Sequence, residues 1–421
     1  MTDLSYISPL SAASMPGLKK RYKTERFFRM TGLAAIVASL GFLAFLMLSI
    51  SIQGMGAFFK TEIRFEVEQA WIEDAAGDSY SLLRNIMGNS DPTVTGRTAK
   101  REYRRLVGAD AEDKLRNEII GQEIATDGPV VIWLPASDDV DVAVKDGLGT
   151  TASGVDTGQL SQRQVDWIMG LTAGNRIRTD FNMGFLLNGD SRDAERAGVG
   201  GALLGSLFTL IICFVLSFFV GVMAAVYLEE FAPKNKATLF LEVNINNLAS
   251  VPSIIFGLLG LAIFLNGFGL PRSSSLVGGM VLALMTLPTI IIASRVSLRS
   301  IPPSIREAAL GLGATRVQTV FHHVVPLALP GMLTGAILGM ARALGETAPL
   351  LMIGMVAFIA DPPSSFTDPA TAMPVQIFLW SDSPERAFTE KTAGAIMVLI
   401  VFLILMNLAA VLLRKKFEKK W

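Results

Sequence analysis

Long apolar runs alternate with polar segments along the whole chain. Five runs carry no charged residue, and they cover 33–52, 197–228, 243–271, 273–294 and 392–413. A helix needs about 20 mostly apolar residues to cross a bilayer, and each run is long enough. A sixth stretch, 331–359, is apolar except for Arg342 and Glu346. The pattern therefore predicts an all-α polytopic membrane protein with six transmembrane helices.

The first run, 33–52, has two interpretations: a cleaved signal peptide or an uncleaved signal anchor. The basic region before it, residues 1–32, is long for a signal peptide. The apolar run exceeds the usual length of a signal-peptide core, and no clear A-x-A cleavage site follows it. We therefore expect 33–52 to remain in the protein as the first transmembrane helix.

Basic residues in the short flanks predict the orientation of the spans. Six lysines and arginines precede the first run, and five follow the last. The last outside loop, 360–391, holds two basic and five acidic residues. Since lysine and arginine concentrate on the cytoplasmic side, we expect both termini, 1–32 and 416–421, in the cytoplasm. Arg295, which follows the fourth run, is expected to snorkel to the membrane interface.

The long polar segment between the first two runs, residues 53–196, is large enough to bury a core of its own. Amphipathic spacing predicts helices over 62–74 and 100–124, and the apolar run 130–134 predicts a strand. Glycine, threonine and serine mark 147–158 as a loop. The expected result is an inserted extracytoplasmic α/β domain.

Composition and charge narrow the class of function. Only 18% of the residues are charged, against roughly 25% in soluble proteins, which excludes a single soluble domain. The net charge of zero hides an acidic middle, since residues 53–198 hold 24 acidic and 16 basic residues. The inserted domain is therefore expected to make protein contacts and is a poor candidate for capturing an anion. No concentrated basic surface indicates a nucleic-acid partner.

Catalytic and metal-binding residue types are scarce in this chain. Cys213 is the single cysteine, which excludes a disulfide framework, and His322 and His323 are the two histidines. No G-x-x-x-x-G-K-[ST] sequence occurs, so the chain holds no ATP site of the P-loop kind. We therefore expect no cofactor, no metal and no catalysis by this chain, and any ATP hydrolysis must come from another polypeptide.

The segment after the fourth run is too polar for the membrane and too apolar for a free loop; it reads S-I-R-E-A-A-L-G-L-G-A-T-R-V-Q-T-V-F-H-H-V-V-P. Ser304 and Glu307 have the spacing of a capping box, and two glycines, the second at Gly313, break the helix that follows. The pattern predicts a turn and then a second helix, 317–325, that runs along the membrane face and ends at Pro326. Taken alone, it is typical of an amphipathic interfacial segment.

This segment resembles the coupling signature E-A-A-x₃-G-x₉-I-x-L-P of type I importer permeases of the ATP-binding cassette (ABC) class. The matching residues are, in order, Glu307, Ala308, Ala309, Gly313 and Pro326. His323 and Val325 depart from the isoleucine and leucine of the pattern. The resemblance implies a type I ABC importer permease fold, with a five-helix core over 197–415 and a coupling loop at about 298–330. It also implies that a separate ATPase subunit couples to this chain through four of these residues: Glu307, Ala308, Ala309 and Gly313.

Two opposite charges interrupt the fifth transmembrane stretch. Arg342 and Glu346 are four residues apart, so a helix places them on one face. A charge near the bilayer centre costs at least about 2.5–3.5 kcal/mol unless it is paired or hydrated. One interpretation is a structural pair that pins this helix to a neighbour. The other is a substrate pathway, because the planar guanidinium group binds phosphate through two hydrogen bonds and Glu346 can hold or release it.

Three strings narrow the resemblance to PstA-type phosphate permeases. They are N-L-A-S-V-P-S-I-I-F-G at 247–257, G-E-T-A-P-L-L at 345–351 and M-P-V-Q-I-F at 373–378. The resemblance implies one permease subunit of an ATP-driven phosphate importer in a bacterial plasma membrane. The implied partners are a homologous second permease, two ATPase subunits and an extracytoplasmic phosphate-binding protein. The insertion at 53–196 departs from the shorter members, so its role does not follow from the resemblance.

Three alternatives stay open at this point. A permease of the same class for another oxyanion, such as molybdate or phosphonate, fits the coupling signature, although G-E-T-A-P-L-L argues against it. A membrane sensor would use 53–196 to bind a ligand, but the four further spans and the lack of a recognisable signalling domain count against it. An enzyme would have to work with one cysteine, two histidines and scattered carboxylates.

Overall fold

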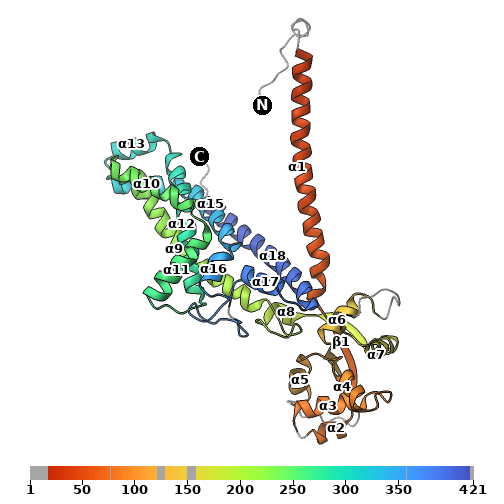
Figure 1. Cartoon of the computed structure of the whole chain (residues 1–421). Coiled ribbons are helices and arrows are strands. Elements are labelled where there is room, and N and C mark those ends of the chain that lie inside the picture. The colour runs from red at the N-terminus through yellow and green to blue at the C-terminus, as the bar shows by residue number, and fades with distance from the viewer. Residues whose placement is uncertain (1–17, 76, 121–128, 149–157, 357, 418–421) are drawn as a thin grey trace. The chain divides into compact units, whose positions relative to one another are not determined.

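The computed structural model describes residues 18–75, 77–120, 129–148, 158–356 and 358–417 (Figure 1). The chain divides into two compact units, residues 1–53 and residues 54–421. The described part of the first unit is a single helix, α1 (Leu18–Gly54), of 37 residues. At 1.5 Å per residue it is about 55 Å long, more than a bilayer core requires. Its apolar side chains are exposed, and it contains the predicted first span.

Residues 59–181, in the second unit, contain a sheet and several helices. Strand β1 (Phe59–Val67) lies between β2 (Val130–Pro135) and β3 (Ile177–Phe181), and both pairings are antiparallel. The predicted strand 130–134 is present as β2. The predicted loop 147–158 lies largely outside the described residues.

The predicted helix 62–74 is wrong over its first half. Ile63, Phe65 and Val67 are fully buried, whereas Glu66 between them is exposed. This alternation has the period of two that a strand requires, so the apolar face of β1 packs on the core and the helix α2 (Gln69–Asp74) begins only afterwards.

Short helices pack with this sheet around one hydrophobic core, which contains Phe65 of the sheet and Tyr103 and Ile168 of the helices. Besides α2 they are α3 (Ser79–Asn89), α4 (Arg97–Arg104), α5 (Asp110–Leu115), the π-helical turn η2 (Arg116–Ile120), α6 (Asp138–Lys145) and α7 (Gln162–Ala173). The predicted helix 100–124 is therefore interrupted between α4 and α5, and its last residues lie outside the described part of the chain. Val107, in the interruption, forms a β-bridge with Ala136, which draws the backbone out of the helix.

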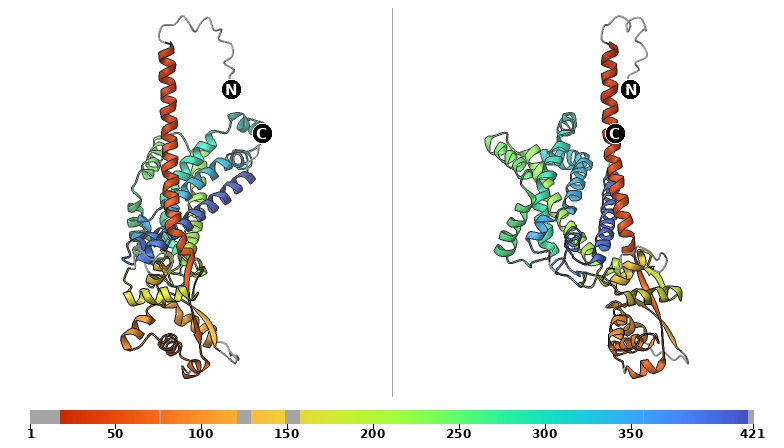
Figure 2. Two further views of the ribbon diagram at one scale, coloured as in Figure 1. Left: turned by 90° about the vertical axis from the view of Figure 1, so that its right-hand side faces the viewer. Right: turned by 45° about the vertical axis from the view of Figure 1, so that its right-hand side comes forward.

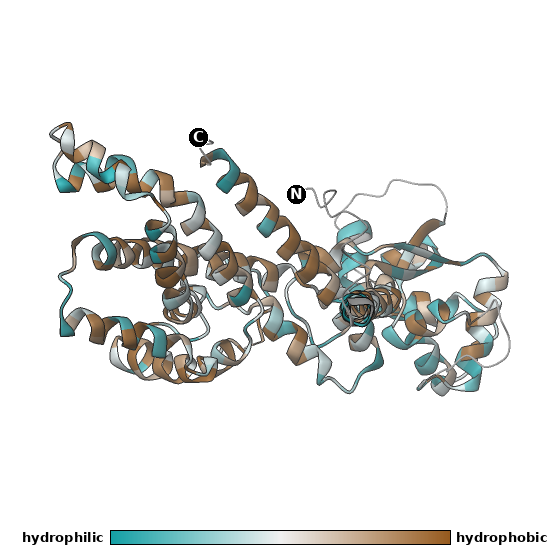
Figure 3. Ribbon diagram, turned by 90° about the horizontal axis from the view of Figure 1, so that it is seen from above, coloured by the Kyte–Doolittle hydropathy of each residue, from teal (hydrophilic) through white to brown (hydrophobic). Residues whose placement is uncertain are grey.

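The C-terminal helical region, residues 183–417, contains the long apolar helices. Its elements are α8 (Met183–Leu187), α9 (Gly200–Val226), η3 (Tyr227–Phe231), α10 (Lys236–Ala249), α11 (Ser253–Gly260), η4 (Leu261–Gly267), α12 (Ser275–Arg299), α13 (Pro303–Gly311), α14 (Arg316–Thr319), η5 (Val320–Val324), α15 (Val325–Leu344), α16 (Ala348–Met352), α17 (Met373–Ser381) and α18 (Arg386–Phe417). Figure 3 shows that apolar residues dominate the long helices, while polar residues gather towards several helix ends.

Among the described residues, five helices are long and apolar enough to cross a membrane, and six only if a bent pair counts as one span. That pair replaces the predicted span 243–271. Its two parts, α10 and α11 with η4, meet at an angle of 102°. Pro252 explains the bend, because it lacks an N–H group and restricts Val251 before it.

The predicted fifth span, 331–359, is also not one helix. A continuous helical stretch runs from Arg316 to Leu344, so it begins earlier than expected. It ends at Gly345, and the short helix α16 follows after a break. The apolar pattern identified a membrane segment here but not its ends, because the segment that follows the break is apolar as well.

Close helix packing holds the C-terminal helical region together. Helix α12 packs against both α9 and α15, as two further views show (Figure 2). A Cβ atom on Gly279 would lie 2.5 Å from Cβ of Ile212, and one on Gly221 would lie 2.8 Å from Cγ2 of Ile290. Glycine is needed at both positions because the backbones approach so closely, as is typical of membrane helices.

Candidate functional site

Helix α13 carries the start of the coupling signature, and its first turn differs from the prediction. The N-cap residue is Pro302, Pro303 lies in the first helical turn, and no side chain caps the helix. The predicted capping box of Ser304 and Glu307 is therefore wrong. Proline suits the first turn because its fixed φ matches the helix and its missing N–H would have had no intrahelical acceptor.

The turn after α13 depends on glycine, as predicted. Gly313 has a φ of +87°, a conformation that other residues rarely adopt. The N–H of Ala314 donates to the carbonyl oxygen of Ala309 at 3.1 Å, which closes the end of the helix. Thr315 then caps α14 and forms a capping box with Gln318, one helix later than expected.

The coupling signature presents a partly apolar surface. Glu307, Ala308 and Gly313 are exposed, whereas Ala309 is only 7% exposed and packs inward. Leu312 is 91% exposed. Other exposed apolar side chains of the same segment are Leu310, Val317 and Phe321. Clustered exposed apolar side chains are typical of a surface that binds another protein.

The second half of the signature does not form a separate helix along the membrane face. Helix α14, the π-helical turn η5 and α15 follow one another without a gap. The helix passes through Pro326, because this proline lies in the first turn of α15 directly after the π-helical turn, where a missing N–H is tolerated. The predicted end at Pro326 is therefore wrong, and the coupling segment joins directly to a membrane helix.

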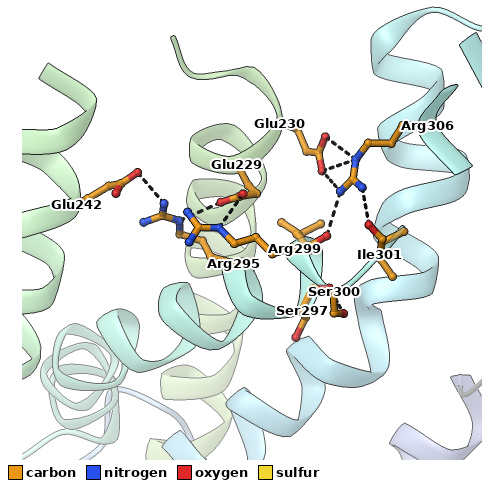
Figure 4. A network of polar contacts seen from close by, with 10 residues as sticks. Glu229, Glu230, Glu242, Arg295, Ser297, Arg299, Ser300, Ile301 and Arg306 are labelled. Carbon is orange, nitrogen blue, oxygen red and sulfur yellow. Dashed lines mark hydrogen bonds and ion pairs between the residues drawn. The ribbon is translucent and has the colours of Figure 1, made fainter. Parts of the chain in front are cut away.

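An ion pair ties α13 to the end of the first long helix of this region. Arg306 donates from Nη2 to Oε1 of Glu230 at 2.6 Å, and from Nε to the two carboxylate oxygens at 3.2 and 3.3 Å (Figure 4). It also donates to the carbonyl oxygens of Ile301 at 2.7 Å and Leu298 at 3.0 Å. We call the Arg306–Glu230 pair the α13 clasp, since it fixes α13 to both η3 and the end of α12.

Two further arginines extend this network to α10. Arg295 donates to Glu242 at 2.6 Å and to Glu229 at 3.4 Å, and Arg299 donates to Glu229 at 2.8 Å (Figure 4). The Arg295 side chain is only 13% exposed, so the expected snorkelling position is wrong. A signal for the network was available in the sequence, because Glu229 and Arg295 each border a charge-free run on the same predicted side of the membrane.

Arg342 and Glu346 do pair, but at a helix end. Arg342 lies in the last turn of α15, Gly345 is the C-cap residue, and Glu346 follows in the break. Nε of Arg342 is 3.5 Å from Oε1 of Glu346, and the side chains are 53% and 21% exposed. The predicted i, i+4 ion pair is therefore present. The guanidinium group keeps much of its surface free for a further partner.

The three strings that suggested a subfamily come together around this helix break. A Cβ atom on Gly257, in α11, would lie 2.7 Å from Cα of Pro349, in α16. Leu350 and Pro374 line one small cavity together with Leu344. Segments that are far apart in the sequence therefore support the break that carries Arg342 and Glu346.

Sequence reasoning missed a charged junction at which the start of α18 meets α6 and residues 194–197. Lys391 is 7% exposed, and its Nζ donates to the carbonyl oxygen of Ala194 and, at 2.7 Å, to that of Ala197. Lys145 of α6 pairs with Glu390 at 3.0 Å. Lysine is rarely buried unless it has hydrogen-bond partners, and here two backbone oxygens accept from it.

Eight of the sixteen residues that line a small cavity beside this junction are charged. Burial raises the pKa of the Asp110 carboxyl, although Arg196 lies 2.7 Å from it. Burial also raises the pKa of Glu195, which accepts a hydrogen bond from the N–H of Asp138 at 3.1 Å. Across the described residues, no group of three or more histidine, cysteine or carboxylate side chains is placed to hold a metal ion.

Two family models match this chain. One, described as "Binding-protein-dependent transport system inner membrane component", covers residues 217–421. The other, described as "Domain of unknown function (DUF3333)", covers residues 16–153. Neither match includes residues 154–216, and the match over 16–153 includes helix α1 as well as most of the sheet-containing region.

Individual relatives match about half of this chain. A "Probable ABC transporter permease protein YqgI" of Bacillus subtilis is 32% identical over 246 residues, which are 54% of this chain and 81% of that protein. A "Phosphate transport system permease protein PstA 1" of Mycobacterium tuberculosis is 32% identical over 219 residues, 52% of this chain and 70% of that protein. A solved structure of the MetNI methionine ABC transporter is 20% identical, covers 51% of this chain and 95% of that chain, and has a TM-score of 0.42, too low to support a fold assignment.

Proposed function

This chain belongs to the binding-protein-dependent inner-membrane transport components, as a PstA-type permease of the ABC class, and we propose that it imports inorganic phosphate. In this proposal it forms part of the translocation pathway together with a homologous second permease. Two ATPase subunits supply the energy, and an extracytoplasmic phosphate-binding protein delivers the substrate. The chain itself catalyses no reaction.

The observation that carries the proposed coupling to an ATPase is the exposed surface of α13 and its turn. The choice of phosphate rests on the similarity to PstA permeases. Leu312 is almost fully exposed, and Ala308 and Gly313 leave room for another backbone to approach. We assign this surface to the ATPase subunit, in agreement with the coupling signature. Because α14 to α15 continue into the membrane, a push on the docked α13 would reach the break at Gly345 through one continuous helix.

We assign Arg342 and Glu346 to the substrate pathway. Arg342 is half exposed although it lies at the end of a membrane helix, and a phosphate ion suits its planar fork of donors. Glu346 would hold the guanidinium group when no anion is present and release it when one arrives. Broken membrane helices in transporters are typical places for substrate contacts, which supports this assignment over a purely structural pair.

The location follows from the same proposal. We place the chain in a bacterial plasma membrane, as a multi-pass protein with both termini in the cytoplasm and residues 53–196 outside. The basic flanks of the first and last spans support this orientation. Transport of another oxyanion, such as molybdate or phosphonate, is the alternative, because the coupling segment is independent of the cargo.

Purification of the chain together with its co-expressed neighbours tests the function. The complex should contain an ABC ATPase and a second permease, and it should take up labelled phosphate into proteoliposomes only with ATP and the binding protein. Uptake of labelled molybdate or phosphonate serves as the matched control. If either of them were taken up faster than phosphate, that oxyanion would be the substrate. A complex without an ATPase would contradict the proposed importer function altogether.

A further inference from the structure

The inserted domain is acidic as a whole, yet it carries a basic groove. The groove lies between α3 and α4, which pack against each other (Figure 1), and has a volume of about 710 Å³. Five basic side chains line it: Arg84, Arg97, Lys100, Arg101 and Arg104. Net charge predicted a domain that does not capture anions, but net charge says nothing about how the charges are distributed.

The spacing along α4 explains how these charges gather. Arg97, Arg101 and Arg104 follow the helical i, i+4, i+7 spacing and so share one face, while Ala99 and Tyr103 are buried on the other. Tyr103 is fully buried against Trp167, with ring centroids 5.2 Å apart. The core therefore anchors α4 and holds its basic face towards α3.

Within the part of the chain that the structure describes, no carboxylate forms an ion pair with any of the five groove cations. Other basic residues of the same domain do have such partners: Lys60 and Lys114 pair with Glu62, and Arg163 pairs with Glu102. Arg104 donates to the hydroxyl of Tyr80 at 3.0 Å, which orients it without neutralising it. Like charges this close repel one another, so an anion in the groove would relieve an unfavourable arrangement.

We propose that this groove binds a multiply charged phosphoryl compound. Arginine forks match phosphoryl oxygens through paired hydrogen bonds, and Asn89 adds a neutral donor at the same wall. The side-chain amide of Asn85, also at this wall, donates to Asp74 at 3.0 Å. The volume falls within the range of about 300–1,000 Å³ that accommodates a multi-atom ligand. The site is separate from the transport pathway, and it does not depend on which ion the permease carries.

Two sources have this chemistry: a soluble polyphosphate and the headgroup of an anionic phospholipid. The complete complex in phosphatidylcholine nanodiscs distinguishes them. One arm titrates it with sodium tripolyphosphate by calorimetry at low salt. The other measures its co-flotation with phosphatidylcholine vesicles that contain or lack phosphatidylglycerol.

The variant R97Q/R101Q removes two groove charges that are exposed and make no ion pair among the described residues, so folding should be preserved. The control R105Q/R116Q removes the same charge from exposed arginines of the same domain that do not line the groove. ATP-driven transport by both variants checks that the complexes are intact.

The groove variant should bind tripolyphosphate at least about tenfold more weakly, or should no longer float with the phosphatidylglycerol vesicles. The control variant should change the binding affinity or the floated fraction by less than about twofold. Loss in the first arm identifies a soluble polyphosphate, and loss in the second alone identifies a lipid headgroup. Absence of both interactions in the unmodified protein overturns the proposal. Equal weakening in the two variants overturns it too, because it would mean diffuse attraction to the whole surface.

Discussion

The α13 clasp should decide how firmly the coupling helix is held, and Arg306→Ala is the change that tests it. The substitution removes three hydrogen bonds to Glu230 and two to the carbonyl oxygens of Ile301 and Leu298. It leaves the Glu230 side chain, which is 10% exposed, without its cation. Loss of one partner from a buried pair costs about 3–5 kcal/mol, and we take the lower end because Arg306 is 23% exposed.

About 3 kcal/mol corresponds to a rise of roughly a hundredfold in the population of undocked α13. Hydrogen exchange of the backbone amides of residues 303–311 measures that population directly, because an undocked short helix loses its protection. These amides should exchange roughly a hundredfold faster in the Arg306→Ala complex, and less phosphate should be transported for each ATP hydrolysed.

Arg316→Ala is the matched control, because this arginine is exposed on the adjacent helix α14 and forms no ion pair among the described residues. It should leave the exchange of 303–311 and the transport ratio unchanged. If Arg306→Ala also left both unchanged, the clasp would not hold α13, and its role in coupling would be refuted.

Three further predictions address the turn, the junction and its pH dependence. Gly313→Leu places a side chain in a left-handed backbone conformation, at a cost of about 1–2 kcal/mol, and blocks the docking surface. Co-purification of the ATPase and phosphate uptake should therefore fall. Normal uptake would contradict the docking assignment. Lys391→Met leaves the carbonyl oxygens of Ala194 and Ala197 without this donor, and each lost hydrogen bond should lower the stability by about 1–3 kcal/mol. The inserted domain should then be more sensitive to limited proteolysis. Unchanged digestion would show that the lysine does not anchor the junction. Burial raises the pKa of Glu195 above its unfolded value of 4.5, so the stabilising contribution of this group is full below pH 4.5 and is lost as the pH rises through the folded pKa. Glu195→Gln should therefore reduce the fall in Tm over that pH window. An unaltered pH profile of Tm in scanning fluorimetry would exclude this effect.

Local patterns in the sequence predicted the features that depend on local physics. Charge-free runs located the membrane helices, since the bilayer core excludes unpaired charges wherever they occur in the chain. The i, i+4 spacing predicted the Arg342–Glu346 ion pair, and Gly313 predicted the turn after α13. By contrast, β1 was mistaken for a helix, because its alternating pattern is short and polar residues at Glu62 and Thr61 are buried with the apolar ones.

The features that sequence reasoning missed depend on contacts between distant residues. The α13 clasp joins residues 76 positions apart, and Lys391 reaches backbone oxygens almost 200 positions away. No periodicity links such partners. Proline was also misread at Pro326, because the π-helical turn before it removes the conflict that normally ends a helix.

Phosphate uptake into proteoliposomes by Arg342 and Glu346 variants tests the central claim most directly, provided that the yield of assembled complex is measured beside it. Arg342→Lys keeps the charge but loses the fork, so uptake should be impaired while the complex assembles normally. Arg342→Ala should abolish uptake, and Glu346→Ala should change its rate without lowering the yield. Full transport by the double alanine variant, with single variants that fail to assemble, would contradict the pathway role and show that the pair is structural.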